Sequence, residues 1–93
     1  MEIKLDENDS QGRFYVGDKD KPVALLNYFY KTENVLVIAH TEVDSSLQGQ
    51  GVGKALIEAV VNFAKQNDLK IQPLCTYASA VLNKNKAYKS ILI

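Results

Sequence analysis

The sequence predicts an α+β fold, in which a mixed sheet of about four strands packs with two helices. Three β-rich runs joined by short turns occupy residues 12–43, as expected of an antiparallel meander. A stretch of helical periodicity follows over about residues 51–67, and a short strand is predicted after it over 69–72. A strand, a helix and a strand in this order indicate a parallel pair with a right-handed crossover. We expect one domain spanning 1–93, since a domain usually contains roughly 50–250 residues.

The first half of the chain contains the predicted meander. Residues 12–16 are a short β-rich run, and the sequence Gly-Asp-Lys-Asp-Lys-Pro after it has the composition of a turn. Residues 23–30 are rich in apolar and aromatic side chains, which favours a second strand. The run at 35–43 begins with uninterrupted apolar residues. Such a run is typical of a central strand covered on both faces.

The second half contains the predicted helices. Apolar side chains recur at helical spacing at Val52, Leu56, Ala59, Val60 and Phe63. Polar and charged side chains occupy the other face, which makes this an amphipathic helix. The strand predicted at 69–72 ends near Pro73, and a second, shorter helix is predicted over 77–88.

The composition describes a globular chain with no strong overall charge. Hydrophobic residues make up 46% of the chain and charged residues 24%, which excludes a disordered or low-complexity protein. Lys and Arg total 11, as do Asp and Glu, so no net field draws the protein to nucleic acid or to an anionic membrane. The single cysteine, Cys75, cannot form an internal disulfide, and the first residues lack the apolar segment of a signal peptide. We therefore expect a cytoplasmic protein without nucleic-acid or membrane partners.

A glycine-rich loop lies between the predicted central strand and the first helix. The sequence Gln-Gly-Gln-Gly-Val-Gly at 48–53 exposes backbone N–H groups beside a helix N-terminus, which suits a phosphate or pyrophosphate. The loop is not a P-loop, because Gln48 stands at the first glycine position and Ala55 follows Lys54. It also lacks the third glycine of the dinucleotide fingerprint, where Lys54 stands instead. The structural alternative is that the glycines only form a tight turn.

The pattern that the loop does match is Gln-x-x-Gly-x-Gly, formed by Gln48, Gly51 and Gly53. This pattern resembles the acetyl-coenzyme A loop of the GCN5-related N-acetyltransferases, which reads Arg or Gln, two residues, Gly, one residue, then Gly or Ala. The stretches His-Thr-Glu-Val at 40–43 and Pro-Leu-Cys at 73–75 are similar to a subgroup of very short, GCN5-like proteins. The resemblance covers nearly the whole chain.

The resemblance implies a minimal acetyltransferase fold that uses acetyl-coenzyme A (acetyl-CoA) as cosubstrate. In the family, backbone amides of the loop hold the pyrophosphate, and the strand before the loop holds the pantetheine and the acetyl carbonyl. Carried over to this chain, the cofactor-binding residues are Val43, Gln48, Gly49, Gln50, Gly51, Val52, Gly53 and Lys54. The implied activity is acetyl transfer to an unidentified amine. Two alternatives are an acyl-CoA-binding or sensing module without turnover, and an interaction module whose glycine loop is only structural.

Three polar side chains are candidates for the chemistry, which needs a polarised thioester, a deprotonated amine and a proton for the leaving thiolate. Cys75 follows the short strand and precedes the last helix, so it is a candidate nucleophile or thiol acid, or else a buried core residue. His40, the only histidine, lies on the adjacent predicted strand and is a candidate base, including for the Cys75 thiol, or else a structural residue. Glu42 is expected on the same face of that strand, where it would orient His40, deprotonate the amine itself, or simply face solvent.

Further residues are weighed for lesser roles. Tyr77 and Tyr88 are candidate acids, because many members of the resembled family use a tyrosine on the last helix. Lysines that would neutralise CoA phosphates, if they are not plain surface residues, are Lys54, Lys84, Lys86 and Lys89. One histidine and one cysteine supply too few ligands for a zinc site, so no metal is expected.

The acceptor side of the implied site has few residues to form it. Only about 20 residues precede the second predicted strand, too few for the helices that wall the acceptor site in longer family members. Three alternatives follow. The acceptor is large, such as a protein or peptide; a homodimer completes the wall, although a monomer is equally compatible with the sequence; or acceptor chemistry has been lost.

Overall fold

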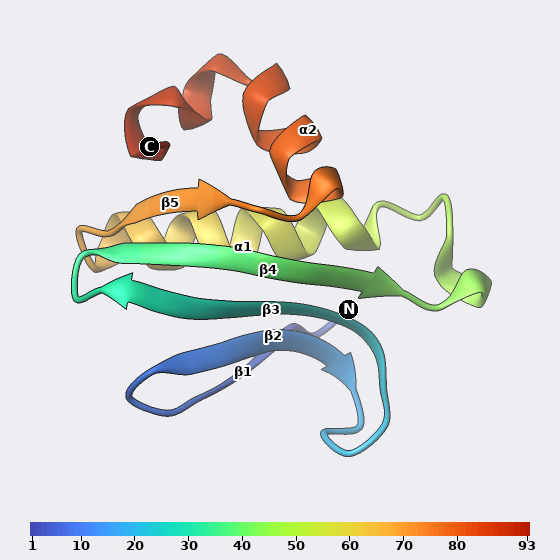
Figure 1. Cartoon of the computed structure of the whole chain (residues 1–93). Coiled ribbons are helices and arrows are strands. Elements are labelled where there is room, and N and C mark those ends of the chain that lie inside the picture. Colours follow the sequence, from blue (N-terminus) through green and yellow to red (C-terminus); the bar gives the residue numbers. More distant parts are fainter.

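The computed structural model describes residues 1–93 and contains one five-stranded mixed sheet with strand order β1-β2-β3-β4-β5. Neighbouring strands from β1 to β4 are antiparallel, and β5 pairs with β4 in parallel (Figure 1). Along the chain the elements are β1 (Lys4–Glu7), β2 (Gln11–Gly17), β3 (Pro22–Thr32), β4 (Val35–Val43), the 3-10 turn η1 (Ser45–Leu47), α1 (Val52–Gln66), β5 (Lys70–Pro73), α2 (Thr76–Lys84) and the 3-10 turn η2 (Lys86–Ile91). The predicted fold class is confirmed, with one strand more than the sequence indicated.

Two elements differ from the sequence prediction. The extra strand, β1, contains a single apolar residue, Leu5, and is held by backbone pairing with β2. The helix predicted over 77–88 stops at Lys84, and the chain continues as η2. Asn85 causes this break, because its side-chain oxygen accepts a hydrogen bond from the N–H of Ala87 at 2.9 Å and starts a new turn.

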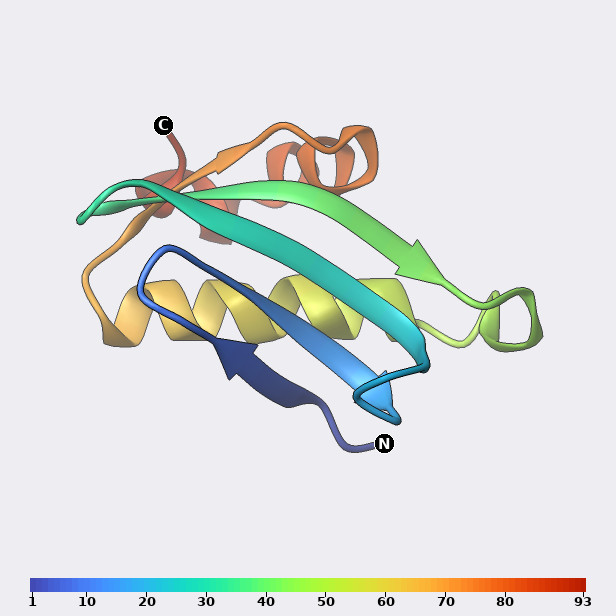
Figure 2. The same ribbon diagram turned by 60° about the horizontal axis from the view of Figure 1, so that its bottom comes forward.

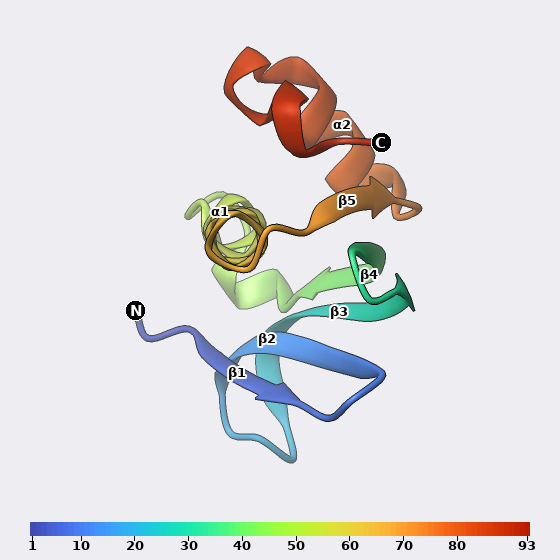
Figure 3. The same cartoon turned by 90° about the vertical axis from the view of Figure 1, so that its left-hand side faces the viewer.

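Helix α1 packs its apolar stripe on one face of the sheet. Its buried residues are Val52, Gly53, Leu56, Ile57, Val60, Val61 and Ala64. All but Gly53 join side chains of β3 and β4, such as Leu26 and Leu36, and residues of α2 in one hydrophobic core. Figure 3 shows α1 against the sheet, with α2 and η2 beyond the β5 edge. None of the helices is both long and apolar enough to cross a membrane.

The opposite face of the sheet carries no helix (Figure 3). Two of its apolar side chains, Val23 and Phe29 of β3, are each 38% exposed. They alternate with Ala24 and Tyr28, which are 2% exposed on the core side, as expected of a strand with one solvated face. This face is therefore open to solvent in part, although Tyr15 and Val37 on it are 7% and 2% exposed.

Strand β4 extends beyond its parallel partner, and this difference in length creates the site. The β4–β5 pairing runs only from Val35–Lys70 to Ile38–Pro73. The N–H groups of Leu74 and Cys75 then both donate to the carbonyl of Ile38, at 3.0 and 3.2 Å. Figure 2 shows β4 continuing toward the glycine loop while the chain after β5 turns away into α2. The last residues of β4 therefore have no neighbouring strand on that side.

A β-bulge lies where β4 leaves β5. Asn27 pairs with His40 whereas the next residue, Tyr28, pairs with Ile38, so Ala39 is an extra residue in β4. Side chains alternate along a strand, and the extra residue reverses which ones face the core. After the bulge, Thr41 and Val43 are the residues on the α1 side.

Candidate functional site

An open cleft of about 540 Å³ lies at the free end of β4. Its walls are the last residues of β4, the glycine loop, the first turn of α1 and one residue of α2. The lining residues are Thr41, Val43, Leu47, Gln48, Gly49, Gly51, Val52, Gly53, Lys54 and Tyr77. All residues predicted to bind the cofactor line this cleft except Gln50, whose side-chain amide donates to the carbonyl of Ser46 at 3.4 Å.

The glycines of the loop are required for two different reasons. Gly49 and Gly51 have φ angles of +81° and +77°, a left-handed conformation that other L-residues adopt only at a cost. A Cβ atom at either position would meet nothing within 4 Å, so the space above them is open. Gly53 is instead limited by packing, because a Cβ atom there would lie 2.6 Å from the hydroxyl oxygen of Tyr77.

The first turn of α1 presents backbone N–H groups without partners. The first bond into the helix joins the N–H of Ala55 to the carbonyl of Gly51 at 3.0 Å, and Gly51 has no side chain to cap the turn. The N–H groups of residues 52–54 therefore donate to no protein acceptor, as expected at an uncapped helix N-terminus. Unpaired N–H groups and the dipole at a helix N-terminus are together suited to an anion.

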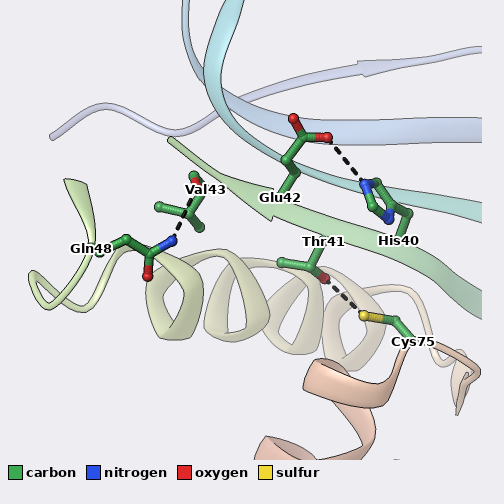
Figure 4. A network of polar contacts seen from close by, with 6 residues as sticks. All are labelled: His40, Thr41, Glu42, Val43, Gln48 and Cys75. Atoms are coloured by element: carbon green, nitrogen blue, oxygen red, sulfur yellow. Dashed lines mark hydrogen bonds and ion pairs between the residues drawn. The ribbon is translucent and has the colours of Figure 1, made fainter. Parts of the chain in front are cut away.

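The loop is fastened to β4 by side chains, which leaves those N–H groups free. The amide of Gln48 donates to the carbonyl of Val43 at 3.1 Å (Figure 4). Asp44 accepts hydrogen bonds from the N–H and the hydroxyl of Ser46, at 2.9 and 2.8 Å. These two bonds lower the pKa of Asp44. The loop is thus held in place by Gln48 and Asp44.

Cys75 lies at the N-terminus of α2, next to the free end of β4. Its sulfur and the hydroxyl oxygen of Thr41 are 3.6 Å apart (Figure 4). Burial acts to raise the pKa of the thiol, but hydrogen bonds from the N–H of Ala78, the Thr41 hydroxyl and the N–H groups of Tyr77 and Thr41 outweigh burial. The pKa of Cys75 is therefore lowered, so the thiolate forms at a lower pH than in a free cysteine.

His40 and Glu42 form a pair on the other face of β4. The Nε2 atom of His40 and a carboxylate oxygen of Glu42 are 3.1 Å apart, and the side chains are 57% and 68% exposed. The prediction that they share a face is confirmed. Figure 4 shows that they point away from Thr41 and Cys75. The structure therefore does not bring His40 to Cys75; the residue between the pair in sequence, Thr41, contacts the thiol instead.

The two candidate tyrosines lie in different places. Tyr77 lines the cleft and is 41% exposed, and its pKa is raised by burial and by the charge of Cys75. Tyr88 lines a second cavity of about 420 Å³, together with Lys54, Lys84 and Lys86. Lys54 lines both cavities, so they lie next to each other.

Comparison with known proteins places this cleft in a family context. The family described as GCN5-related N-acetyl-transferase matches residues 13–91. The solution structure of a GCN5-like protein from Staphylococcus aureus is 40% identical in sequence and has a TM-score of 0.81, with 99% of this chain and 87% of that chain covered. The family match over residues 13–91 includes the glycine loop, the end of β4 and Cys75.

Two more distant similarities are informative. Protein NATD1 from Gallus gallus is 32% identical over 62 residues, which cover 67% of this chain and 56% of NATD1. The match thus spans little more than half the length of that relative. Rv2747 from Mycobacterium tuberculosis, solved in complex with CoA, is 19% identical with a TM-score of 0.53 over 63% of this chain and 38% of that chain. At this identity the likeness shows a common fold.

Proposed function

The chain belongs to the GCN5-related N-acetyltransferase family, and on that premise we propose that it transfers an acetyl group from acetyl-CoA to an amine. Family membership supports acyl transfer in general. The observation that carries the specific proposal is the set of free N–H groups at residues 52–54, which open onto the cleft at the end of β4. A pyrophosphate fits such a helix N-terminus. The complex of Rv2747 with CoA supports a CoA ligand for this fold.

In this proposal the pantetheine arm of CoA lies along the free edge of β4. Asp44 donates its N–H to the carbonyl of Val23 in β3, so by alternation the backbone groups of Val43 and Thr41 point the other way. No strand occupies that side beyond Ile38. The two amide groups of a pantetheine can pair with such an edge as an added strand would.

The adenosine end of the cofactor extends toward the second cavity. Lys84 and Lys86 line that cavity, and Lys54 lines both cavities. Ammonium groups act as point charges for phosphates, so these lysines suit the remaining phosphate of CoA. This arrangement predicts binding that weakens as the salt concentration rises.

The acetyl end then reaches Cys75, and two chemical routes fit the geometry. In one, the Cys75 thiolate attacks the acetyl carbon, the bond to the CoA sulfur breaks, and the CoA thiolate leaves and takes a proton from solvent. The amine then attacks the acetyl-cysteine and regenerates the thiolate. In the other, the amine attacks acetyl-CoA directly and the Cys75 thiol gives its proton to the leaving sulfur. The lowered pKa of Cys75 favours the first route.

We assign His40 and Glu42 to the acceptor. They lie on the open face of the sheet, where an amine approaches without passing through the CoA cleft. An imidazole or carboxylate there can accept the proton of the incoming ammonium group. This solvated position suits an acceptor as large as a protein or peptide, and equally a small amine.

A second candidate function is acyl-CoA binding without turnover. The observation that favours it is the uncovered sheet face, where Val23 and Phe29 are each 38% exposed and no helix walls an acceptor site (Figure 3). Under this alternative the cleft binds the cofactor but no amine is held near the thioester. Both candidates predict cofactor binding, so they differ only in product formation.

The experiment is an amide NMR titration with acetyl-CoA, followed by intact-mass and CoA-release measurements with and without amines. We expect changes in amide chemical shift centred on residues 42–54 and on Cys75. Gly51→Ala should weaken binding, whereas the matched control Gly17→Ala, also at a positive φ of +94° but outside the cleft, should not. Binding with no CoA release in any amine mixture would select the non-enzymatic candidate. No shifts at millimolar cofactor would refute both.

A further inference from the structure

We propose that Thr41 is the positioning residue for Cys75, with its hydroxyl holding the sulfur as a thiolate beside the cleft. This inference rests on the proposed function, because it concerns the group placed nearest the thioester. It differs from the sequence-based expectation that His40 would act on Cys75. Thr41 contacts the sulfur of Cys75 and also lines the cleft, so it lies between the thiol and the cleft.

The first step of the argument is the position of Thr41 in the sheet. Beyond Ile38, β4 has no partner on the β5 side, and the N–H of Thr41 points to that side. The sulfur of Cys75 lies 3.6 Å from the Thr41 hydroxyl oxygen, just after the chain leaves the strand pair at Ile38. Thr41 is therefore the residue of β4 that contacts the thiol.

The second step is that no stronger electrostatic partner is available. His40 and Glu42 extend from the other face of β4. On α2 the facing groups are the ring of Tyr77, which is titratable, and backbone N–H groups. From the glycine loop and α1, Lys54 is the only charged side chain that lines the cleft. No charged side chain pairs with the sulfur, so its ionisation depends on hydrogen bonds.

The third step is the change of role of the hydroxyl when the thiol ionises. In the neutral pair the S–H donates to the Thr41 oxygen over 3.6 Å. In the thiolate the hydroxyl reverses and donates to sulfur, a charge-assisted bond that is stronger than the neutral one. Thr41→Val removes this donor and keeps the branched shape, while the backbone N–H groups stay in place.

The test is the pH dependence of iodoacetamide alkylation of cofactor-free protein, followed by intact mass. Thr41→Val should shift the midpoint upward and slow alkylation at neutral pH about tenfold, which corresponds to one pKa unit. Thr41→Ser, which keeps the hydroxyl, should resemble wild type. His40→Asn serves as the control on the opposite face and should leave the profile unchanged. Amide spectra of each variant check that the fold is retained, and Thr41→Ala replaces Thr41→Val if the latter fails to fold.

Two results would overturn the inference. One is a Thr41→Val or Thr41→Ala profile that superimposes on that of wild type in folded protein. The other is a His40→Asn shift as large as that of Thr41→Val. Because alkylation requires neither CoA nor an amine, these results are independent of whether the protein transfers acetyl groups. If Thr41→Val shifts the alkylation profile as expected but the protein does not bind acetyl-CoA, the proposed function is refuted and the role of Thr41 stands.

Discussion

Gly53 lies beneath the ring of Tyr77, and alanine at this position tests how the two helices meet at the cleft. The new Cβ atom would lie 2.6 Å from the Tyr77 hydroxyl oxygen, 2.9 Å from Cζ and 3.1 Å from Cε2. An unobstructed Gly→Ala change in a helix stabilises a protein by up to about 1 kcal/mol. Overpacking costs about 1–3 kcal/mol. Because the ring is 41% exposed and can swing outward, we expect the low end of that cost and a net loss of at most about 1 kcal/mol.

The decisive assay is a double-mutant cycle measured by urea unfolding. In a Tyr77→Ala background the obstruction is gone, so Gly53→Ala should raise the free energy of unfolding by up to about 1 kcal/mol. The sign of the effect therefore reverses between backgrounds, with a coupling of about 1–2 kcal/mol. Tyr88→Ala is the matched control, since this tyrosine lies in η2 and lines a different cavity. An equal effect of Gly53→Ala in all backgrounds would refute the packing argument.

Three further predictions concern stability. Gly51→Ala forces an L-residue into a φ of +77° and should cost about 1–2 kcal/mol, seen as a lower Tm by calorimetry; an unchanged Tm would mean that the loop relaxes freely. Burial and the hydrogen-bonded Glu7 carboxylate raise the pKa of Tyr28 above its ordinary value of about 10. The folded state then binds this proton more tightly, so stability should fall as the pH rises above about 10, and Tyr28→Phe should flatten that part of the urea-unfolding pH profile. Leu56→Ala removes a side chain that is 0% exposed and should cost about 2–5 kcal/mol in urea unfolding; a loss below about 1 kcal/mol would contradict its place in the core.

The sequence predicted those elements whose apolar pattern is long enough to identify. The run at 35–43 is β4 as predicted, and the amphipathic stretch predicted over about 51–67 is α1, Val52–Gln66. Strand β1 was missed because its pairing is made by backbone hydrogen bonds, which any sequence can form, and Leu5 alone makes no pattern. The break at Asn85 depends on one side-chain hydrogen bond, which periodicity does not report.

Within the site, the glycine loop could be recognised from the sequence because the backbone conformation that requires glycine is a local property. The left-handed φ angles of Gly49 and Gly51 belong to the loop itself and appear in the sequence as glycines. The contact between Thr41 and Cys75 joins residues 34 positions apart and depends on where β5 ends. The sequence did indicate that this strand ends near Pro73, but which residue of β4 lies opposite that end is set by tertiary pairing, and no local pattern predicts it.

The bulge at Ala39 decides which polar residues serve the cleft. Strict alternation from Leu36 and Ile38, both 0% exposed in the core, would turn His40 toward α1 and Thr41 toward solvent. The extra residue in β4 reverses this order, so Thr41 meets the cysteine and His40 faces the open side of the sheet. The sequence-based pairing of His40 with Cys75 assumed adjacent strands without this reversal. A bulge bends and re-aims the residues after it, and here it separates the polar groups of β4 into one set that faces the cleft and another that faces the open side of the sheet.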